Sequence, residues 1–398
     1  MFTPARIRLL VVTCCALFMA MLDNLVLGVA LPSIQRSFNA GITDLQWFMN
    51  AYTLAFSVLL IPFSMMGERF GRKKMFLTGL VLFTVGSVLC GLSGNSLQLI
   101  LSRALQGVGG AAIVPLSLTL VNAGFPENMR AAAFGIWSGI SGLGLSIGPL
   151  IGGLIVEGAP WQMIFWVNVP IGLLSLLFGS FWLTETKGER KPLDLPGVLL
   201  IAAGLFGIVY GLEQGNTKGW TSLEVIGSLV TGTVLLILFY VWERNRETPY
   251  IRFALFRNRR YTAYILTGFW MNAGIFGAIF LLTLFLQQAQ GYSALEAGVR
   301  TMAWTGCTMI CAPIAGLAVG RFGSRTVLTV GMTAQALALA GFAVLIATAG
   351  VDVPFLWQAP LMMLAGAGMG LSFTPLAHGV MSSVPEQSSG EAVAAHFL

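Results

Sequence analysis

The feature that most constrains this chain is a succession of long, continuous apolar runs separated by short polar segments. A helix needs about 20 consecutive apolar residues to cross the hydrocarbon core of a bilayer. The runs lack the period of two that the strands of a spanning β-barrel would show. Only structures that satisfy their own backbone hydrogen bonds can span lipid. The sequence therefore predicts an all-α polytopic membrane protein.

The composition agrees with a protein that has lipid as its outer solvent. Of the 398 residues, 56% are hydrophobic and 10% are charged, whereas soluble domains average about 25% charged residues. The formal net charge of +6 lies in the loops between apolar runs. We therefore attribute the charge to membrane topology and expect the lipid bilayer, and no nucleic acid, as a partner.

We expect about twelve transmembrane helices. They cover approximately residues 9–31, 45–66, 75–93, 97–123, 132–156, 163–183, 195–213, 223–242, 261–287, 295–319, 327–348 and 356–383. The start of the chain, with Arg6 and Arg8 before an apolar run, is also typical of a signal peptide. The run continues past Asp23 to Pro32, which favours a first spanning helix.

The distribution of basic residues predicts the orientation of these spans. With the N-terminus in the cytoplasm, the inner segments hold eighteen of the 22 Lys and Arg residues, and the outer segments hold Arg36 and Lys218. Basic residues accumulate on the cytoplasmic side, so we expect a cytoplasmic N-terminus and an inner (plasma) membrane location. The basic stretch 243–260 follows from this topology, and a lipid-binding amphipathic helix is the alternative.

An internal repeat divides the chain. Residues 67–74 read GERFGRKK after the second span, and residues 320–327 read GRFGSRTV after the tenth. Transporter folds are commonly built from such repeats. The repeat predicts a six-helix bundle over residues 1–190, an inserted hairpin over residues 191–245, and a second bundle with four helices over residues 246–398.

Two charged residues lie inside the predicted spans at similar depth. Asp23 is about 12 Å from the outer end of the first span, and Arg103 is about 9 Å from the outer end of the fourth. Gln106 shares the helix face of Arg103, and Asn24 neighbours the acid. Ionisable groups in membranes usually mark function. We expect these residues to form a cavity for proton coupling and substrate; a static ion pair is the alternative.

The basic loop after the second span is the predicted inner gate. It contains Glu68, Arg69, Gly71 and Arg72. We expect the two arginines to hold an acidic or helix-terminal partner, and Gly71 to form the tight turn. Positive-inside topology alone is the competing explanation.

Small residues recur in the fifth span. Gly144, Gly148 and Gly152 are spaced by four and share one helix face, with Pro149 and Gly153 beside them. Small residues let another backbone approach closely, and proline bends a helix. The pattern predicts either plain close packing or a hinge between moving parts.

The sequence lacks the signatures of several other protein classes. It has no GxxxxGK[ST] phosphate loop and no GxSxG nucleophile motif, so we expect neither an ATP-driven protein nor an enzyme. The five cysteines lie in apolar spans without ligand-spaced partners, so we expect no metal site and no disulfide framework.

Taken in order, the motifs resemble the major facilitator superfamily, in particular its fourteen-helix drug:proton antiporters. The resemblance rests on LDNLVLGVALP (residues 22–32), ERFGRKK (68–74), RALQG (103–107), GLSIGPLIGG (144–153) and NVPIG (168–172). It implies that Asp23 is the acid of the first helix and that Arg103 is linked to proton transfer. It also identifies residues 144–153 as the antiporter helix.

Some positions depart from the family pattern. Ser64 and Glu68 replace the usual glycine and aspartate of the loop motif, Gln162 replaces an arginine, and Asn24 and Gly28 replace threonine and asparagine. The last two helices of the family pattern are also missing. We therefore interpret the chain as C-terminally shortened and expect this form to transport poorly.

The function that the resemblance implies is export of small amphipathic compounds by alternating access. The proton gradient would supply the driving force, without a cofactor. A metabolite carrier of the same fold and a non-transporting membrane protein are the alternatives. The sequence identifies neither the substrate nor the oligomeric state.

Overall fold

The computed structural model describes residues 3–187, 194–246, 249 and 253–384, and within these residues every regular element is a helix. The predicted all-α fold is therefore confirmed. The first elements are α1 (Pro4–Phe38), α2 (Ile42–Phe70), α3 (Arg72–Leu92), α4 (Ser96–Gly124), α5 (Glu127–Gly158), α6 (Met163–Trp166) and α7 (Asn168–Trp182). They are followed by α8 (Leu195–Lys218), α9 (Leu223–Arg244), η1 (Phe253–Arg257), α10 (Arg259–Leu284), η2 (Phe285–Ala289), α11 (Ala294–Ala349) and α12 (Phe355–Ser382).

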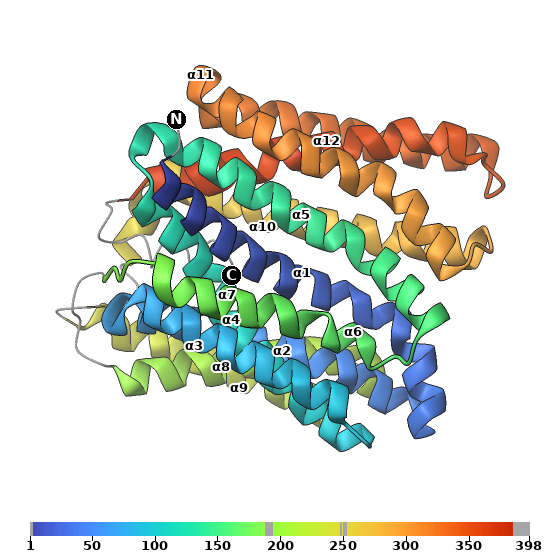
Figure 1. Ribbon diagram of the computed structural model, residues 1–398, viewed down its shortest axis with the longest axis horizontal. Coiled ribbons are helices and arrows are strands. Elements are labelled where there is room, and N and C mark those ends of the chain that lie inside the picture. Colours follow the sequence, from blue (N-terminus) through green and yellow to red (C-terminus); the bar gives the residue numbers. More distant parts are fainter. Residues whose placement is uncertain (1–2, 188–193, 247–248, 250–252, 385–398) are drawn as a thin grey trace.

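All twelve predicted spans fall on these helices. Among the described residues, ten helices are long and apolar enough to cross a membrane. Helix α11 is counted once among these ten but contains two predicted spans, because the chain turns at Gly323, where φ is 77°. Figure 1 shows α11 folding back on itself at this turn. Helix α5, with 32 residues, accounts for the twelfth span.

Polar side chains fix several helix starts. Asn95 Oδ1 accepts from Gln98 N at 2.9 Å, and Ser222 caps α9 by accepting from Val225 N. Ser293 and Glu296 form a reciprocal capping box at the start of α11. Such caps satisfy backbone donors that have no partner inside the helix. The capping residues therefore fix where these helices begin.

Helices α1–α7, here called the first bundle, are followed by the α8–α9 hairpin. The two hairpin helices pack on each other, and α8 packs on α2 (Figure 1). Asp194 at the start of α8 accepts a hydrogen bond from Trp242 Nε1 at 3.0 Å and forms an ion pair with Arg246 Nη1 at 2.7 Å. These contacts hold the start of α8 to the end of α9. The division of the chain at residues 190 and 245 remains a prediction.

Helices α10–α12, here called the second bundle, meet the first bundle along α5. Helix α5 lies between α1 and α11 and contacts both (Figure 1). The second bundle has its own apolar core, which includes Met271 of α10, Trp304 of α11 and Met369 of α12. Helix α5 therefore forms the main packing contact between the first bundle and the second.

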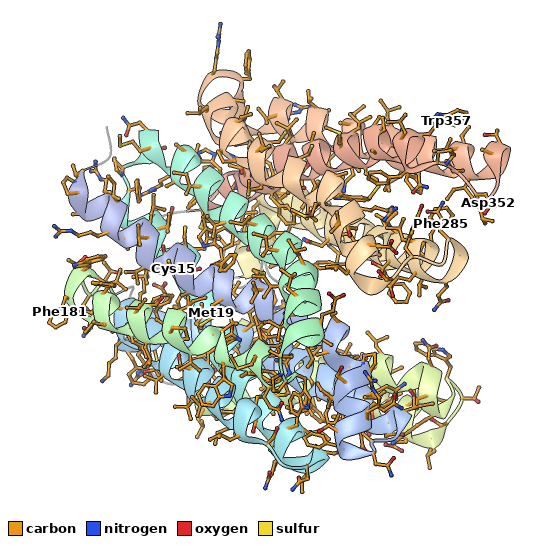
Figure 2. The ribbon with its side chains drawn as sticks, turned by 45° about the vertical axis from the view of Figure 1, so that its right-hand side comes forward. Cys15, Met19, Phe181, Phe285, Asp352 and Trp357 are labelled. Carbon is orange, nitrogen blue, oxygen red and sulfur yellow. The ribbon has the colours of Figure 1, made fainter. Side chains whose placement is uncertain are left out.

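The bundles are joined at the end of the molecule where α1 begins. One apolar cluster there contains Leu10 and Leu17 of α1 together with Tyr261, Val380 and Met381 of the second bundle. At the other end, the apolar clusters of the described residues belong to one bundle each. Figure 2 shows the helices of the second bundle diverging from the first toward the end labelled Asp352. The structure is thus closed at the end that carries the basic loops.

Candidate functional site

The centre of the candidate site is a buried ion pair between α1 and α4. Asp23 Oδ2 accepts a hydrogen bond from Arg103 Nη1 at 2.5 Å, and the two side chains are 0% and 1% exposed. The two residues predicted from matched depth therefore meet in the structure. Removing either partner would leave an unpaired charge in a dry environment, which is strongly unfavourable.

Arg103 is held by more than the carboxylate. Its Nε donates to the Phe48 carbonyl oxygen of α2 at 3.1 Å, and its Nη1 donates to Gln106 Oε1 at 2.8 Å. The guanidinium carbon lies 4.5 Å from the ring centroid of Tyr52, within cation–π range. A planar group with several donors satisfies all of these partners at once, which a lysine ammonium cannot reproduce.

Gln106 connects the ion pair to α3. Its Nε2 donates to Asp23 Oδ1 at 3.2 Å and to Ser87 Oγ at 2.7 Å. Its Oε1 accepts from Cys90 Sγ at 3.2 Å as well as from Arg103. The three-residue spacing of Arg103 and Gln106 places both side chains on one helix face, and both contact Asp23.

Asn168 is a member of the site that the sequence analysis did not select. It begins α7 after the short break that follows α6, and it is fully buried. Its Nδ2 donates to Asp23 Oδ1 at 2.8 Å, whereas its Oδ1 has no partner among the described residues. The signal in the sequence was a polar residue at the start of the NVPIG stretch. It could not identify Asp23 as the partner of Asn168, because the two residues are 145 positions apart.

The ion pair is therefore enclosed by six helices of the first bundle. Polar partners come from α2, α3, α4 and α7 around the acid of α1, and the rings of Tyr52 on α2 and Phe165 on α6 lie beside the Arg103 guanidinium. The site lies inside one bundle, away from the α5 contact with the second. Asn24 stands on α1, but its side chain is outside the described part of the chain, so its predicted place in a substrate cavity stays a prediction.

The predicted inner gate forms the turn between α2 and α3. Arg72 makes two hydrogen bonds to Glu68, at 2.9 and 2.8 Å, and is 5% exposed. Arg69 lies over the Phe70 ring at 5.3 Å. Gly71 separates the helices with φ 114° and ψ 130°, a conformation open mainly to glycine.

Glu185, which follows α7, completes this turn and was missed by the sequence analysis. Its two carboxylate oxygens accept from Lys73 N at 3.1 Å and Lys74 N at 3.2 Å. These amides belong to the first turn of α3, where a negative charge is favourable. The same inner segment also contains Glu189 and Asp194, so no local signal in the sequence singled out Glu185.

The predicted glycine face of α5 packs against α1. A β-carbon at Gly144 would lie 2.8 Å from Met21 Cβ, and one at Gly152 would lie 3.0 Å from the Val26 carbonyl oxygen. Gly148 is buried between them on the same face, and Gly153 faces Leu295 of α11. The side chain of Pro149 is outside the described part of the chain. Gly144 and Gly152 thus serve packing within the first bundle.

Close contact between the bundles uses other glycines. A β-carbon at Gly135 of α5 would lie 2.9 Å from the Ala312 carbonyl oxygen of α11, and one at Gly139 would lie 3.2 Å from that of Met309. On the other side, Gly316 of α11 lies against the Ala131 backbone. The bundle seam therefore runs along a different face of α5, from Gly135 and Gly139 to Gly153, which meets Leu295 of α11.

Two bundles of membrane-length apolar helices, one of which encloses a charged pair, form the arrangement that is typical of membrane transporters. Among the described residues, no group of three His, Cys, Asp or Glu side chains could hold a metal. The sequence model of the Major Facilitator Superfamily matches residues 13–398. The chain belongs to the Major Facilitator Superfamily, and the predicted resemblance is confirmed at that level.

Relatives and solved structures agree with this assignment. The tetracenomycin C resistance and export protein of Streptomyces glaucescens is 34% identical over 376 residues, which are 94% of this chain and 69% of the relative. The multidrug resistance protein Stp of Mycobacterium tuberculosis (strain CDC 1551 / Oshkosh) is 35% identical over 385 residues, or 96% and 71%. The proton:xylose symporter XylE has the same fold, with a TM-score of 0.69 and 14% identity over 98% of this chain and 86% of the symporter.

Proposed function

We propose that this protein is a proton-coupled exporter of small amphipathic compounds. The observation that carries the proposal is the Asp23–Arg103 pair, buried at 2.5 Å inside the first bundle. Such a pair is stable when the acid is charged and loses its electrostatic attraction when the acid binds a proton. Proton binding at Asp23 can therefore change how α1 and α4 are held together.

The arrangement of the bundles supports an outward-facing state in the proposed alternating-access cycle. The end that carries Arg6, Arg8 and the α2–α3 turn is closed by apolar contacts between the bundles. With the basic loops in the cytoplasm, this is an outward-facing state, in which the proton would enter from outside. Alternating access then requires that the contacts along α5 and at the inner end separate.

The choice of export and of substrate class is supported by the relatives. Two of them are named for resistance to, or export of, tetracenomycin C and multiple drugs. We propose the same direction here, with amphipathic small molecules as substrates. We also propose that the protein lies in the bacterial plasma membrane with a cytoplasmic N-terminus, because inner segments contain most basic residues.

The test is flux in proteoliposomes that contain the purified chain and an imposed pH gradient. Ethidium serves as the amphipathic probe, and an internal dye reports proton movement. Asp23→Asn removes the charge with little change in shape, and we expect it to abolish proton-driven ethidium flux. Glu224→Gln is the matched control, because Glu224 forms an exposed ion pair with Lys218 at the other end of the hairpin loop.

Gradient-driven flux in the wild type that survives in Glu224→Gln and is lost in Asp23→Asn supports the proposal. Ethidium flux that does not depend on the pH gradient would indicate a uniporter. The absence of flux for a panel of anionic, cationic and neutral amphipathic probes would instead favour a metabolite carrier or a protein that does not transport.

A further inference from the structure

Asn168 has a hydrogen-bonding atom that the charged form of the site does not use. Its Nδ2 donates to Asp23 Oδ1 at 2.8 Å. Its Oδ1 is buried and has no partner among the described residues. Buried amide oxygens are normally satisfied, and leaving one unpaired costs stability. The atom therefore suits a second state of the site, in which it faces a donor.

We propose that Asn168 responds to the protonation state of Asp23 by turning its side-chain amide. With a charged carboxylate, Nδ2 points to Asp23 and donates. With a protonated carboxyl, a half-turn of the amide brings Oδ1 to the same place, where it accepts from the acid O–H. The inference rests on the proposed proton coupling, and it makes Asn168 a positioning residue for the proton.

The contacts of Asp23 determine where the proton would sit. Oδ2 faces Arg103 Nη1, which is only a donor. Oδ1 faces two amides, those of Gln106 and Asn168. A proton from external water therefore adds to Oδ1, and its later release to internal water restores the carboxylate. No other bond forms or breaks.

Gln106 cannot make the same turn. Its Oε1 accepts from Arg103 and Cys90, while its Nε2 donates to Asp23 and Ser87. Reversing this amide would place its two N–H groups against the guanidinium, which is also a donor. Of the two amides at Oδ1, only that of Asn168 turns without losing bonds to other side chains of the described site.

Three other charged or titratable side chains face Asp23, namely Arg103 from α4, Tyr52 from α2 and Cys90 from α3. Helix α5 presents Gly144 and Gly152 to this part of α1 and adds none. Arginine stays charged, and tyrosine and cysteine are ordinarily neutral at pH 7. Asp23 is therefore the group that binds and releases the proton.

The experiment is infrared difference spectroscopy of the purified full chain between acidic and alkaline pH. The carboxyl C=O band of Asp23 is identified by its loss in Asp23→Asn. In Asn168→Ala the acid O–H loses its acceptor, so we expect the band to move to a higher wavenumber. The pH midpoint of the band should rise by about one unit, a tenfold change in proton affinity, because the bond lost to the carboxylate is the stronger one.

Matched variants separate this role from simple packing. Asn168→Gln retains both a donor and an acceptor and should keep the band near its original position. Asn122→Ala is the control, because Asn122 is also a buried asparagine of the first bundle whose Oδ1 has no partner in the described part of the chain. It should move neither the band nor its midpoint. If Asn168→Ala does not fold, Asn168→Leu gives the same comparison at a similar size.

The outcomes also distinguish this inference from the proposed function. An Asp23 band that titrates normally in the variants without an amide overturns the inference and leaves proton coupling intact. A lower melting temperature without movement of the band has the same meaning, because it shows a purely structural role. If no carboxyl band depends on Asp23, both the coupling and the inference fail.

Discussion

Arg103 Nη1 lies 2.5 Å from Asp23 Oδ2, and Arg103 is among the largest fully buried side chains of the described structure. The carboxylate also accepts from two amides, and the guanidinium donates to a backbone carbonyl and to Gln106. The charges are thus neutralised by neighbours that come from different helices. Stability and the proposed proton coupling depend on the same few bonds.

The first prediction concerns the energetic coupling of this pair. Arg103→Leu leaves a buried carboxylate without its cation and should destabilise the protein by roughly 3–5 kcal/mol. Adding Asp23→Asn removes the uncompensated charge, so the double variant should recover at least about half of that loss. Thermal unfolding in detergent measures both. Additive losses in the double variant would show that the two side chains act independently.

The second prediction concerns the α2–α3 turn. Gly71 and Gly219 have similar backbone angles, with φ 114° and ψ 130° at Gly71 and φ 87° and ψ 136° at Gly219. A β-carbon at Gly71 would lie 2.5 Å from Glu185 Cδ, whereas one at Gly219 meets nothing within 4 Å. Gly71→Ala should therefore lower the free energy of unfolding more than Gly219→Ala does, by roughly 1–3 kcal/mol for the overpacking alone.

Thermal unfolding of both glycine variants measures this difference. Equal losses of stability in Gly71→Ala and Gly219→Ala would show that backbone strain alone matters at Gly71 and that its contact with Glu185 is unimportant. In that case the capping of α3 by Glu185 would not constrain the turn.

The third prediction separates the bundle seam from packing inside the first bundle. Gly135→Val places methyl groups against the Ala312 carbonyl of α11 and should push the bundles apart. Gly144→Val faces α1 instead and should lower stability without opening the seam. The probe is a cysteine at position 378, because the His378 ring lies 6.4 Å from that of Phe134 across the seam.

In a background without the five native cysteines, thiol labelling at position 378 should increase several-fold in Gly135→Val and stay at the parental rate in Gly144→Val. Valine at Gly227, where a β-carbon meets nothing within 4 Å, is the control. Faster labelling in Gly144→Val than in Gly135→Val would place the moving seam on the α1 face.

The fourth prediction concerns topology. Lys218 ends α8, and Arg257 lies on η1, on the opposite side of the predicted membrane. A membrane-impermeant thiol reagent added to intact cells should label Lys218→Cys and spare Arg257→Cys. Permeabilised cells provide the control, because both positions are exposed and should then react. The reverse pattern in intact cells would contradict a cytoplasmic N-terminus.

Much of the fold could be predicted because its signals are local in sequence. Each span can be recognised by its length and its apolar composition, and the basic GRFGSR stretch marks the turn at Gly323. The pairing of Asp23 with Arg103 was also predictable, since few charges lie inside spans and these two share a depth. Burial of a charge in lipid is so costly that partners at one depth tend to meet.

The sequence is less informative about which helix packs against which. The spacing of Gly144, Gly148 and Gly152 fitted either plain packing or a hinge; in the structure Gly144 and Gly152 lie against α1, while Gly135 and Gly139 approach α11. Small residues every fourth position indicate that something packs closely, and the same spacing suits any neighbouring helix. Only the arrangement of helices in space identifies the neighbour.

By itself, the sequence determined that the chain is a bundle of apolar helices with one acid and one arginine at matched depth, because bilayer thickness and backbone hydrogen bonding act on each span separately. The tertiary structure alone decided that Asn168 and Tyr52 surround that pair and that Glu185 caps α3. These contacts join residues far apart in the chain. Their geometry depends on how the helices pack, which no local pattern in the sequence records.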